Sequence, residues 1–127
     1  MKTKECLKEV KKIFEQLKNG WIFVEGKKDK QALNNLGFEK ILTIAGNLRL
    51  SCEKLAKEKG EIKVFVLTDI DRRGDQLAGM AKEELEGISL RVDLTMRKKL
   101  AYALNIRYFE NAKRAYDKLI KEGENNG

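Results

Sequence analysis

Residues 63–75, KVFVLTDIDRRGD, join an uninterrupted apolar run to a dense group of charges. The run at 63–68 is rich in Val, Phe and Leu and shows no polar alternation, which is typical of a strand buried on both faces of a parallel sheet. Asp69 and Asp71 follow it directly. Because they lie two residues apart, extended backbone would point both carboxylates to the same side. The segment therefore predicts a buried strand that ends in an acidic loop.

Three more segments have the pattern of strands, namely the apolar runs at 21–24 and 41–44 and the alternating edge strand at 89–93. Helical periodicity separates them. Short strands that alternate with helices are typical of a parallel sheet covered on both faces. We therefore expect an α/β, Rossmann-like fold with a four-stranded, mainly parallel sheet. The expected helices cover about residues 4–18, 27–36, 47–59, 74–86, from 95 onward and 110–121, with Asn47 and Thr95 as N-caps.

The length of 127 residues fits a single domain, 1–127. The chain has no His, which excludes every mechanism that needs an imidazole, serine and cysteine triads included. It also lacks an apolar run of about 18 residues and the apolar core of a secretory signal. We therefore expect a cytoplasmic protein without a membrane partner, in which Cys6 and Cys52 are reduced and buried.

The net charge of +7 is unevenly distributed along the chain. Basic residues exceed acidic ones in residues 1–20 and 91–122, whereas 21–90 is balanced. Such flanking basic segments suit a polyanionic partner. Charge alone leaves a solvated, lysine-rich surface equally open.

Acidic residues follow two of the predicted strands at the point where each strand ends. Glu25 and Gly26 follow the strand at 21–24, as Asp69 and Asp71 follow the strand at 63–68. Sites in parallel sheets form at the carboxyl ends of the strands, and oxygen ligands of this kind suit Mg²⁺. We expect Gly26 and Gly74 to bring the backbone close to a ligand or to adopt a positive φ.

Residues 24–29, VEGKKD, and 66–75, VLTDIDRRGD, together resemble the Toprim domain. This domain is shared by type IA and type II topoisomerases, bacterial primases, OLD-family nucleases, RecR-type recombination mediators and the 5S ribosomal RNA maturase. Its pattern is a strand-end Glu-Gly, then a small-residue loop with Gly, here Gly46, then Asp-x-Asp-x-x-Gly. The resemblance covers a core at about 21–93, followed by a basic, helical extension at about 95–122. By size the chain is similar to the small stand-alone Toprim proteins of archaea and bacteria.

The resemblance implies a role for each acidic residue. It makes Glu25 either a general acid/base or a metal ligand, and it makes Asp69 and Asp71 ligands of Mg²⁺, or of Mn²⁺. Asp75 matches an acidic position that is usually Glu. Asp29 matches a frequent acid that helix capping explains equally well. The implied chemistry is metal-dependent attack on the phosphodiesters of DNA or RNA.

Several basic residues are expected to contact nucleic-acid phosphates, namely Lys27, Lys28, Arg72, Arg73, Arg97, Lys98 and Lys99. Topoisomerases need a tyrosine nucleophile from a separate domain, and we expect the tyrosines here to pack in the core, namely Tyr102, Tyr108 and Tyr116. Primases and the maturase use additional domains. These comparisons favour a small nuclease-like hydrolase. The alternative is a non-catalytic, RecR-like module that binds nucleic acid and acts with a protein partner.

Overall fold

The computed structural model describes residues 2–45 and 47–125. Its centre is one sheet of four strands in the order β2-β1-β3-β4. All three strand pairings are parallel, so the expected α/β architecture is confirmed and the sheet is wholly rather than mainly parallel. The strands are β1 (Trp21–Val24), β2 (Ile41–Thr43), β3 (Lys63–Val66) and β4 (Arg91–Asp93).

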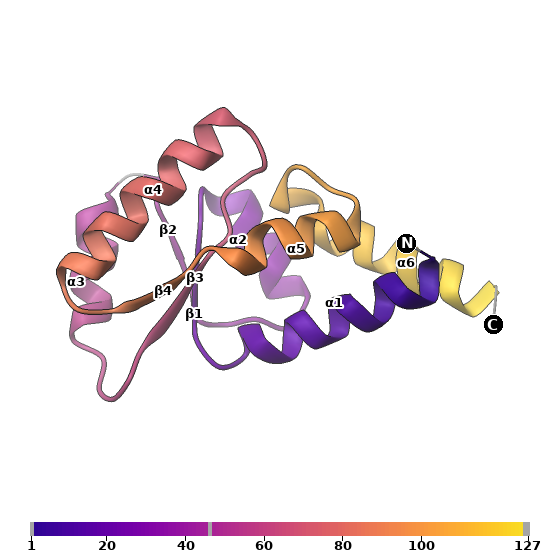
Figure 1. Ribbon diagram of the computed structural model, residues 1–127, viewed down its shortest axis with the longest axis horizontal. Coiled ribbons are helices and arrows are strands. Elements are labelled where there is room, and N and C mark those ends of the chain that lie inside the picture. Colours follow the sequence, from indigo (N-terminus) through magenta and orange to yellow (C-terminus); the bar gives the residue numbers. More distant parts are fainter. Residues whose placement is uncertain (1, 46, 126–127) are drawn as a thin grey trace.

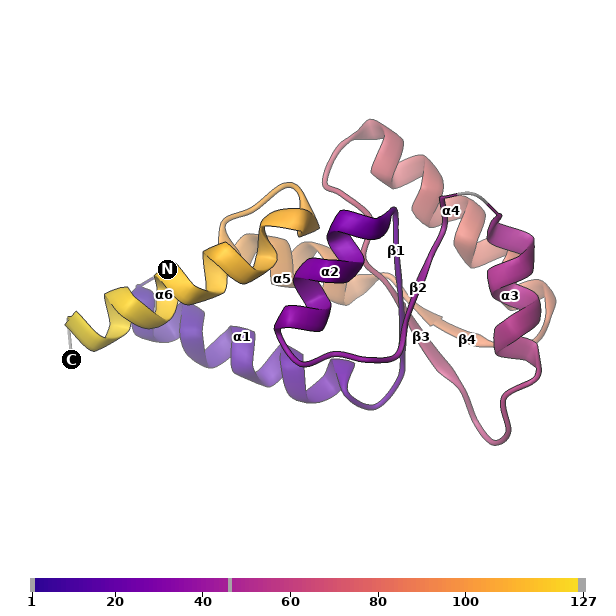
Figure 2. The same cartoon turned by 180° about the vertical axis from the view of Figure 1, so that it is seen from behind.

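Helices cover both faces of the sheet (Figures 1 and 2). One face carries α3 (Leu48–Ala56) and α4 (Arg72–Gly87). The other carries a larger layer that consists of α1 (Thr3–Leu17), α2 (Lys27–Asn35), α5 (Thr95–Leu104) and α6 (Ala112–Asn125), with a short 3₁₀ helix, η1 (Phe109–Asn111), before α6.

The central strands divide the core into two clusters. Ile22 and Phe65 join the cluster under α1, α5 and η1, whereas Phe23 and Val64 join the cluster under α3 and α4. Side chains alternate along a strand, so an uninterrupted apolar run supplies both faces at once. This explains why β1 and β3 have no polar alternation in sequence.

The basic C-terminal region is part of the core layer. Leu100 of α5 and Phe109 of η1 are fully buried beside Val10 and Leu17 of α1. Residues from 95 onward therefore complete one face of the fold, and they bring the segment before α6 to the end of the sheet where the acidic loops lie.

Local differences from the expected elements have simple causes. Helix α4 begins at Arg72 rather than at 74, because the Asp71 side chain caps it by accepting the Gly74 N–H. The Asn47 cap of α3 is confirmed, since its Oδ1 accepts the Leu50 N–H. The expected Thr95 cap is wrong: Asp93 Oδ1 accepts the N–H groups of both Thr95 and Met96, so the cap precedes Thr95.

The structure also bears on the burial of the two cysteines and on membrane-spanning helices. Cys52 is buried, as expected, whereas Cys6 is only half-buried. Over residues 2–45 and 47–125, no helix has both the length and the apolarity to cross a membrane.

Candidate functional site at the carboxyl ends of β1 and β3

The sheet reverses its strand order between β1 and β3. From β1 the chain passes through α2 to β2 on one side, and from β3 it passes through α4 to β4 on the other. In parallel sheets, the carboxyl ends of two strands at such a switch point open into the crevice where ligands bind. Glu25 directly follows β1 and Asp69 lies shortly after β3, so both acids lie at this switch point, at the upper end of the sheet in Figure 1.

Glu25 and Asp69 are in direct contact. The Glu25 Oε2 atom accepts the backbone N–H of Asp69 at 2.6 Å. The Asp69 carboxylate is held from its other side, because its Oδ1 accepts the Phe109 N–H at 3.1 Å. Three distant parts of the chain thus fix the two acids, and the structure brings them together as the strand-end pattern predicts.

Asp29 is a third acid beside this pair. It is buried, and its Oδ2 accepts the Gly26 N–H at 3.0 Å, which caps the first turn of α2. Burial raises the pKa of Asp29, and the charges of Glu25 and Glu110 add to the rise. Asp29 therefore has the capping role that was one of its two predicted explanations, and it also adds negative charge to the crevice.

The environment of Asp69 disfavours its ionised form. Burial, followed by the charges of Asp29 and Glu25, raises the pKa of Asp69 to about 7, although the hydrogen bond from Phe109 acts in the opposite direction. A carboxyl whose pKa is raised toward neutrality is a frequent property of functional sites.

Asp71 and Asp75 have different partners. Asp71 Oδ1 accepts the Gly74 N–H at 2.6 Å and caps α4. Asp75 forms an ion pair with Arg97 at 2.7 Å, and the hydrogen bond from Arg97 lowers the pKa of Asp75. The structure therefore does not assemble the predicted ligand set of Glu25, Asp69 and Asp71. It joins the first two and gives Asp71 a role at the start of a helix.

The prediction that Arg97 contacts nucleic acid is wrong. Its side chain is 5% exposed, and its guanidinium donates to the carbonyl oxygens of Thr68 and Asp69 as well as to Asp75. Because these three acceptors occupy it inside the fold, Arg97 braces the loop after β3 instead of facing solvent.

Gly74 and Gly26, the two described glycines of the motif, differ in the space that surrounds them. A Cβ at Gly74 would overlap the Asp69 carbonyl oxygen, so only glycine lets α4 start this close to the loop. Gly26 has extended backbone with φ −151°, and the space where its Cβ would lie is open. Of the two expected roles, a positive φ is found at neither Gly26 nor Gly74, so close approach of the backbone to a ligand stays a prediction for both. Gly46 lies outside the described residues.

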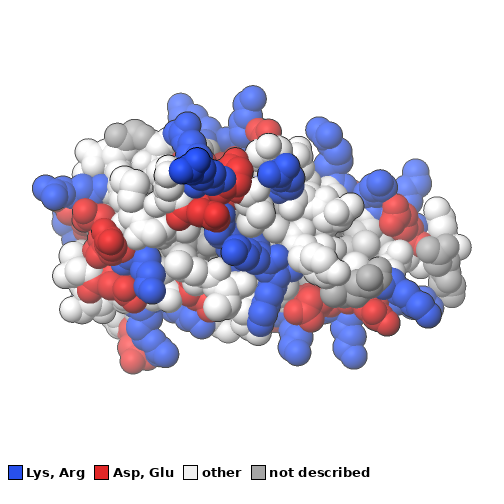
Figure 3. Space-filling view, turned by 45° about the horizontal axis from the view of Figure 1, so that its top comes forward, with Lys and Arg blue, Asp and Glu red and all other residues white. Residues whose placement is uncertain are grey.

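The other predicted phosphate contacts remain on the surface. All six are exposed, namely Lys27, Lys28, Arg72, Arg73, Lys98 and Lys99. Figure 3, in which the top of Figure 1 is turned forward, shows Lys and Arg side chains beside acidic ones on this face. The helices α2 and α4 also start at the crevice, and helix N-termini add partial positive charge there.

Sequence reasoning missed the part played by residues 107–109. The Arg107 carbonyl accepts the Ile70 N–H at 2.7 Å, next to the bond between Phe109 and Asp69. This segment closes the site from the C-terminal region, and no motif in its residues signals the contact. The core position predicted for the tyrosines is wrong for two of them, since Tyr102 is 70% exposed and Tyr108 is 41% exposed. Only Tyr116 packs inward, against the ring of Phe14.

Carboxylate oxygens such as those of Glu25 and Asp69 are donors that a hard cation prefers. Among residues 2–45 and 47–125, no group of three or more acidic, Cys or His side chains is arranged as metal ligands. Mg²⁺ does not require such a group, since it is often held by one or two carboxylates together with water and substrate phosphates. Glu25 and Asp69 supply two carboxylates, and the pKa of Asp69 is raised by burial first and then by the charges of Asp29 and Glu25, which a cation would offset. These residues therefore fit Mg²⁺.

Comparison with known proteins finds relatives of similar size in archaea. The UPF0292 protein of Thermococcus sibiricus is 34% identical over 100 residues, which is 76% of this chain and 77% of that protein. The UPF0292 protein of Pyrococcus furiosus is 35% identical over 101 residues, 77% of this chain and 75% of that protein. This chain belongs to the UPF0292 family. No protein-family model matches it.

Other UPF0292 relatives match a smaller part of the chain. The protein of Thermococcus onnurineus is 43% identical over 82 residues, and the match spans 64% of this chain and 60% of that protein. Among solved structures, a putative protein from Aquifex aeolicus is similar to this UPF0292 chain, with a TM-score of 0.66 and 30% identity over 85% of this chain and 95% of that one. The similarity to this solved structure agrees with an α/β fold in which helices cover both faces of the sheet.

Proposed function

We propose that this UPF0292 chain is a Toprim-type hydrolase that cleaves nucleic-acid phosphodiesters with the help of Mg²⁺ or Mn²⁺. The contact between Glu25 and Asp69 at the switch point of the parallel sheet carries the proposal. Neither acid forms an ion pair with a Lys or Arg within residues 2–45 and 47–125. Two half-buried acids that are held together without a cation repel each other, so a ligand that needs them is a reason for their presence.

Each group has a role in the proposed reaction. Glu25 and Asp69 would hold the ion, which supplies charge neutralisation at the scissile phosphate. Lys27 and Lys28, in the first turn of α2, face solvent where they attract the phosphates on either side. Water would attack the phosphorus as its bond to the leaving oxygen breaks, and Glu25 either remains a ligand or donates a proton to that oxygen. Arg97 and Gly74 position the Asp69 loop without touching the substrate.

A RecR-like, non-catalytic module is the second candidate, and a specific observation favours it. Glu25 Oε2 and Asp71 Oδ1 each already accept a backbone N–H, which leaves fewer free oxygens for a metal than the motif offers. In that function the acids would shape the loops, and the exposed lysines and arginines would bind nucleic acid together with a protein partner.

A cleavage assay with matched variants separates the two functions. Labelled single-stranded and duplex DNA and RNA are incubated with Mg²⁺, Mn²⁺ or EDTA, using wild type, Glu25→Gln, Asp69→Asn and the control Glu83→Gln. The two site variants keep an acceptor oxygen for the Asp69 and Phe109 N–H groups, so the loops remain held. Glu83 is an exposed acid of α4.

The hydrolase predicts cleavage that depends on the divalent ion, is lost in both site variants and is unchanged in Glu83→Gln. The binding module predicts no cleavage of any substrate and tighter binding by Glu25→Gln, since that substitution removes a negative charge that faces a polyanion. Cleavage that persists in Glu25→Gln and Asp69→Asn would refute the proposed site.

A further inference from the structure

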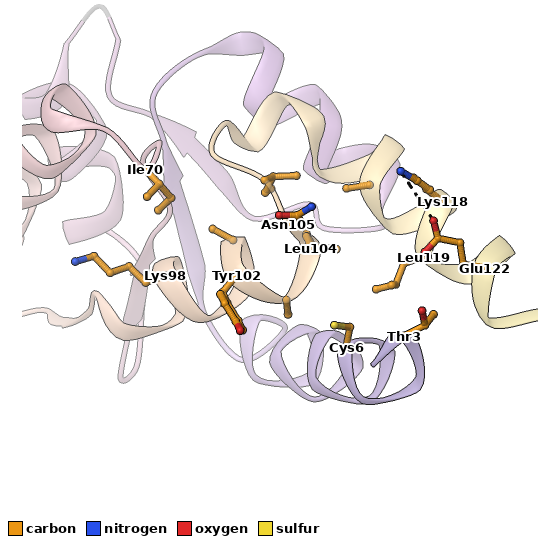
Figure 4. A pocket seen from close by; sticks show the side chains of 14 residues that line it. Thr3, Cys6, Ile70, Lys98, Tyr102, Leu104, Asn105, Lys118, Leu119 and Glu122 are labelled. Atoms are coloured by element: carbon orange, nitrogen blue, oxygen red, sulfur yellow. Dashed lines mark ion pairs between the residues drawn. The ribbon is translucent and has the colours of Figure 1, made fainter. Parts of the chain in front are cut away.

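An open groove of about 800 Å³ runs between α1, α5 and α6 (Figure 4). One end is formed by Ile70, the residue after Asp69, and the other lies near Thr3 and Glu122. Small side chains such as Ala101 and Ala115 line it and leave room. The groove therefore begins at the proposed catalytic loop and leads away from it along the surface.

The end next to the catalytic loop combines an aromatic ring with positive charge. Tyr102 lines the groove and is 70% exposed, and Lys98 lies one helical turn before it on α5, with Ile70 nearby (Figure 4). The charge of Lys98 also reaches Asp75, which places it beside the loop after β3. Arg107 is exposed next to the same loop, with its Nε 3.4 Å from the Ile70 carbonyl oxygen.

Among the described residues that line the groove, the acidic one lies at its far end. Glu122 lies there, and Lys118 partly neutralises it at 3.9 Å. The end near the site thus presents an exposed aromatic ring one helical turn from Lys98, with Arg107 exposed beside Ile70. Proteins that bind single-stranded nucleic acid combine these two elements, a ring on which a base stacks and a basic track for the backbone.

We propose that the groove binds a single-stranded segment of nucleic acid, with a base stacked on Tyr102 and phosphates at Lys98 and Arg107. The inference rests on the proposed function and names its substrate class. A duplex keeps its bases paired and stacked, so it cannot offer a base to Tyr102. The strand would lead from the groove over Ile70 to the Glu25–Asp69 crevice.

Fluorescence anisotropy in EDTA tests the binding separately from cleavage. The probes are labelled oligo(dT), oligo(rU) and a duplex of equal length. Stacking contributes roughly 1–3 kcal/mol per base, so Tyr102→Ala should weaken single-strand binding about tenfold. Tyr102→Phe keeps the ring and should bind within about twofold of wild type. Met80→Ala, which removes another exposed side chain on the opposite helical layer, should have no effect.

Several outcomes would overturn the inference: equal affinity of Tyr102→Ala and wild type, loss of affinity in Tyr102→Phe, or duplex binding as tight as single-strand binding. A dimer in light scattering that Tyr102→Ala dissociates, with oligonucleotide affinity unchanged, would assign the groove to a second copy. The relative affinity for oligo(dT) and oligo(rU) identifies the sugar. If Tyr102→Ala weakens single-strand binding and no variant or wild type cleaves, the groove is supported and the hydrolase is rejected. If Tyr102→Ala cleaves and binds as wild type does, only the groove is rejected.

Discussion

Two acidic groups lie on either side of Ile70, and they differ in what neutralises them. On one side Asp69 is partly buried against Glu25, and its pKa is raised to about 7. On the other side Asp75 is exposed and paired with Arg97, and its pKa is lowered. Both aspartates belong to the same short motif. The surroundings of Asp69 disfavour its charged form, whereas Asp75 is held in its charged form by Arg97.

The difference shows that a motif does not assign roles by residue type. What decides the role is the environment: an ion pair with a guanidinium for Asp75, a backbone N–H at a helix start for Asp71, and burial beside two further carboxylates for Asp69. Burial and charge repulsion at Asp69 favour the binding of a ligand there. The Asp71–Asp75 side instead contributes to the stability of the loop.

The largest expected loss of stability is at Arg97, which braces the loop after β3. Arg97→Met should lower the free energy of unfolding by about 3 kcal/mol, because two carbonyl oxygens of the loop lose their donor inside the fold. Urea unfolding measures the change, with the exposed neighbour Lys98→Met as the control. If both variants unfold at the same urea concentration as wild type, the Arg97 contacts do not stabilise the loop.

A second test targets the close approach of α4, at Gly74, to the backbone of Asp69. Gly74→Ala should lower the free energy of unfolding by about 2 kcal/mol, since its Cβ would overlap the Asp69 carbonyl oxygen and force the loop and helix apart. Gly79→Ala is the matched control in the same helix, where the Cβ has open space and should add roughly 0.5–1 kcal/mol. Equal effects at both positions would contradict the packing of α4 on the loop.

The smallest effect concerns pH in the absence of divalent ions. Because the pKa of Asp69 in the folded chain is about 7, above its ordinary value of 3.8, its protonated form contributes stability that is lost as the pH rises from about 4 to 7. Thermal unfolding in EDTA should therefore show Asp69→Asn gaining stability relative to wild type between about pH 6 and pH 7, by on the order of 1 kcal/mol. Asp75→Asn should show no gain over that range. A constant difference between Asp69→Asn and wild type would place Asp69 in a less charged environment.

The sequence was sufficient to predict the fold, for physical reasons that can be named. The apolar runs at 21–24 and 63–68 could only be buried on both faces, and the residues that end them had to meet at one edge of a parallel sheet. Glu25 and Asp69 were found in this way. The contact from Phe109 could not be found, because it depends on how the C-terminal layer docks more than forty residues away from β3 in the chain.

Two side chains of α5 could have been placed from helical phase. Arg97 is spaced four and seven residues from Ala101 and Leu104, both buried, which puts it on the inner face of the helix. Tyr102 is spaced four residues from Lys98, which puts it on the outer face. The inner position of Arg97 was missed because it belongs to a run of basic residues at 97–99. The outer position of Tyr102 was missed because aromatic side chains were assumed to pack in a core.

Calorimetric titration with Mg²⁺ at about pH 8, where Asp69 is mostly ionised, tests the central claim that the Glu25–Asp69 side is the ligand site and the Asp71–Asp75 side is structural. The account predicts weak binding by wild type, loss of binding in Glu25→Gln and Asp69→Asn, and binding within about threefold of wild type in Asp71→Asn. Binding that Asp71→Asn abolishes while Glu25→Gln and Asp69→Asn retain it would contradict the account.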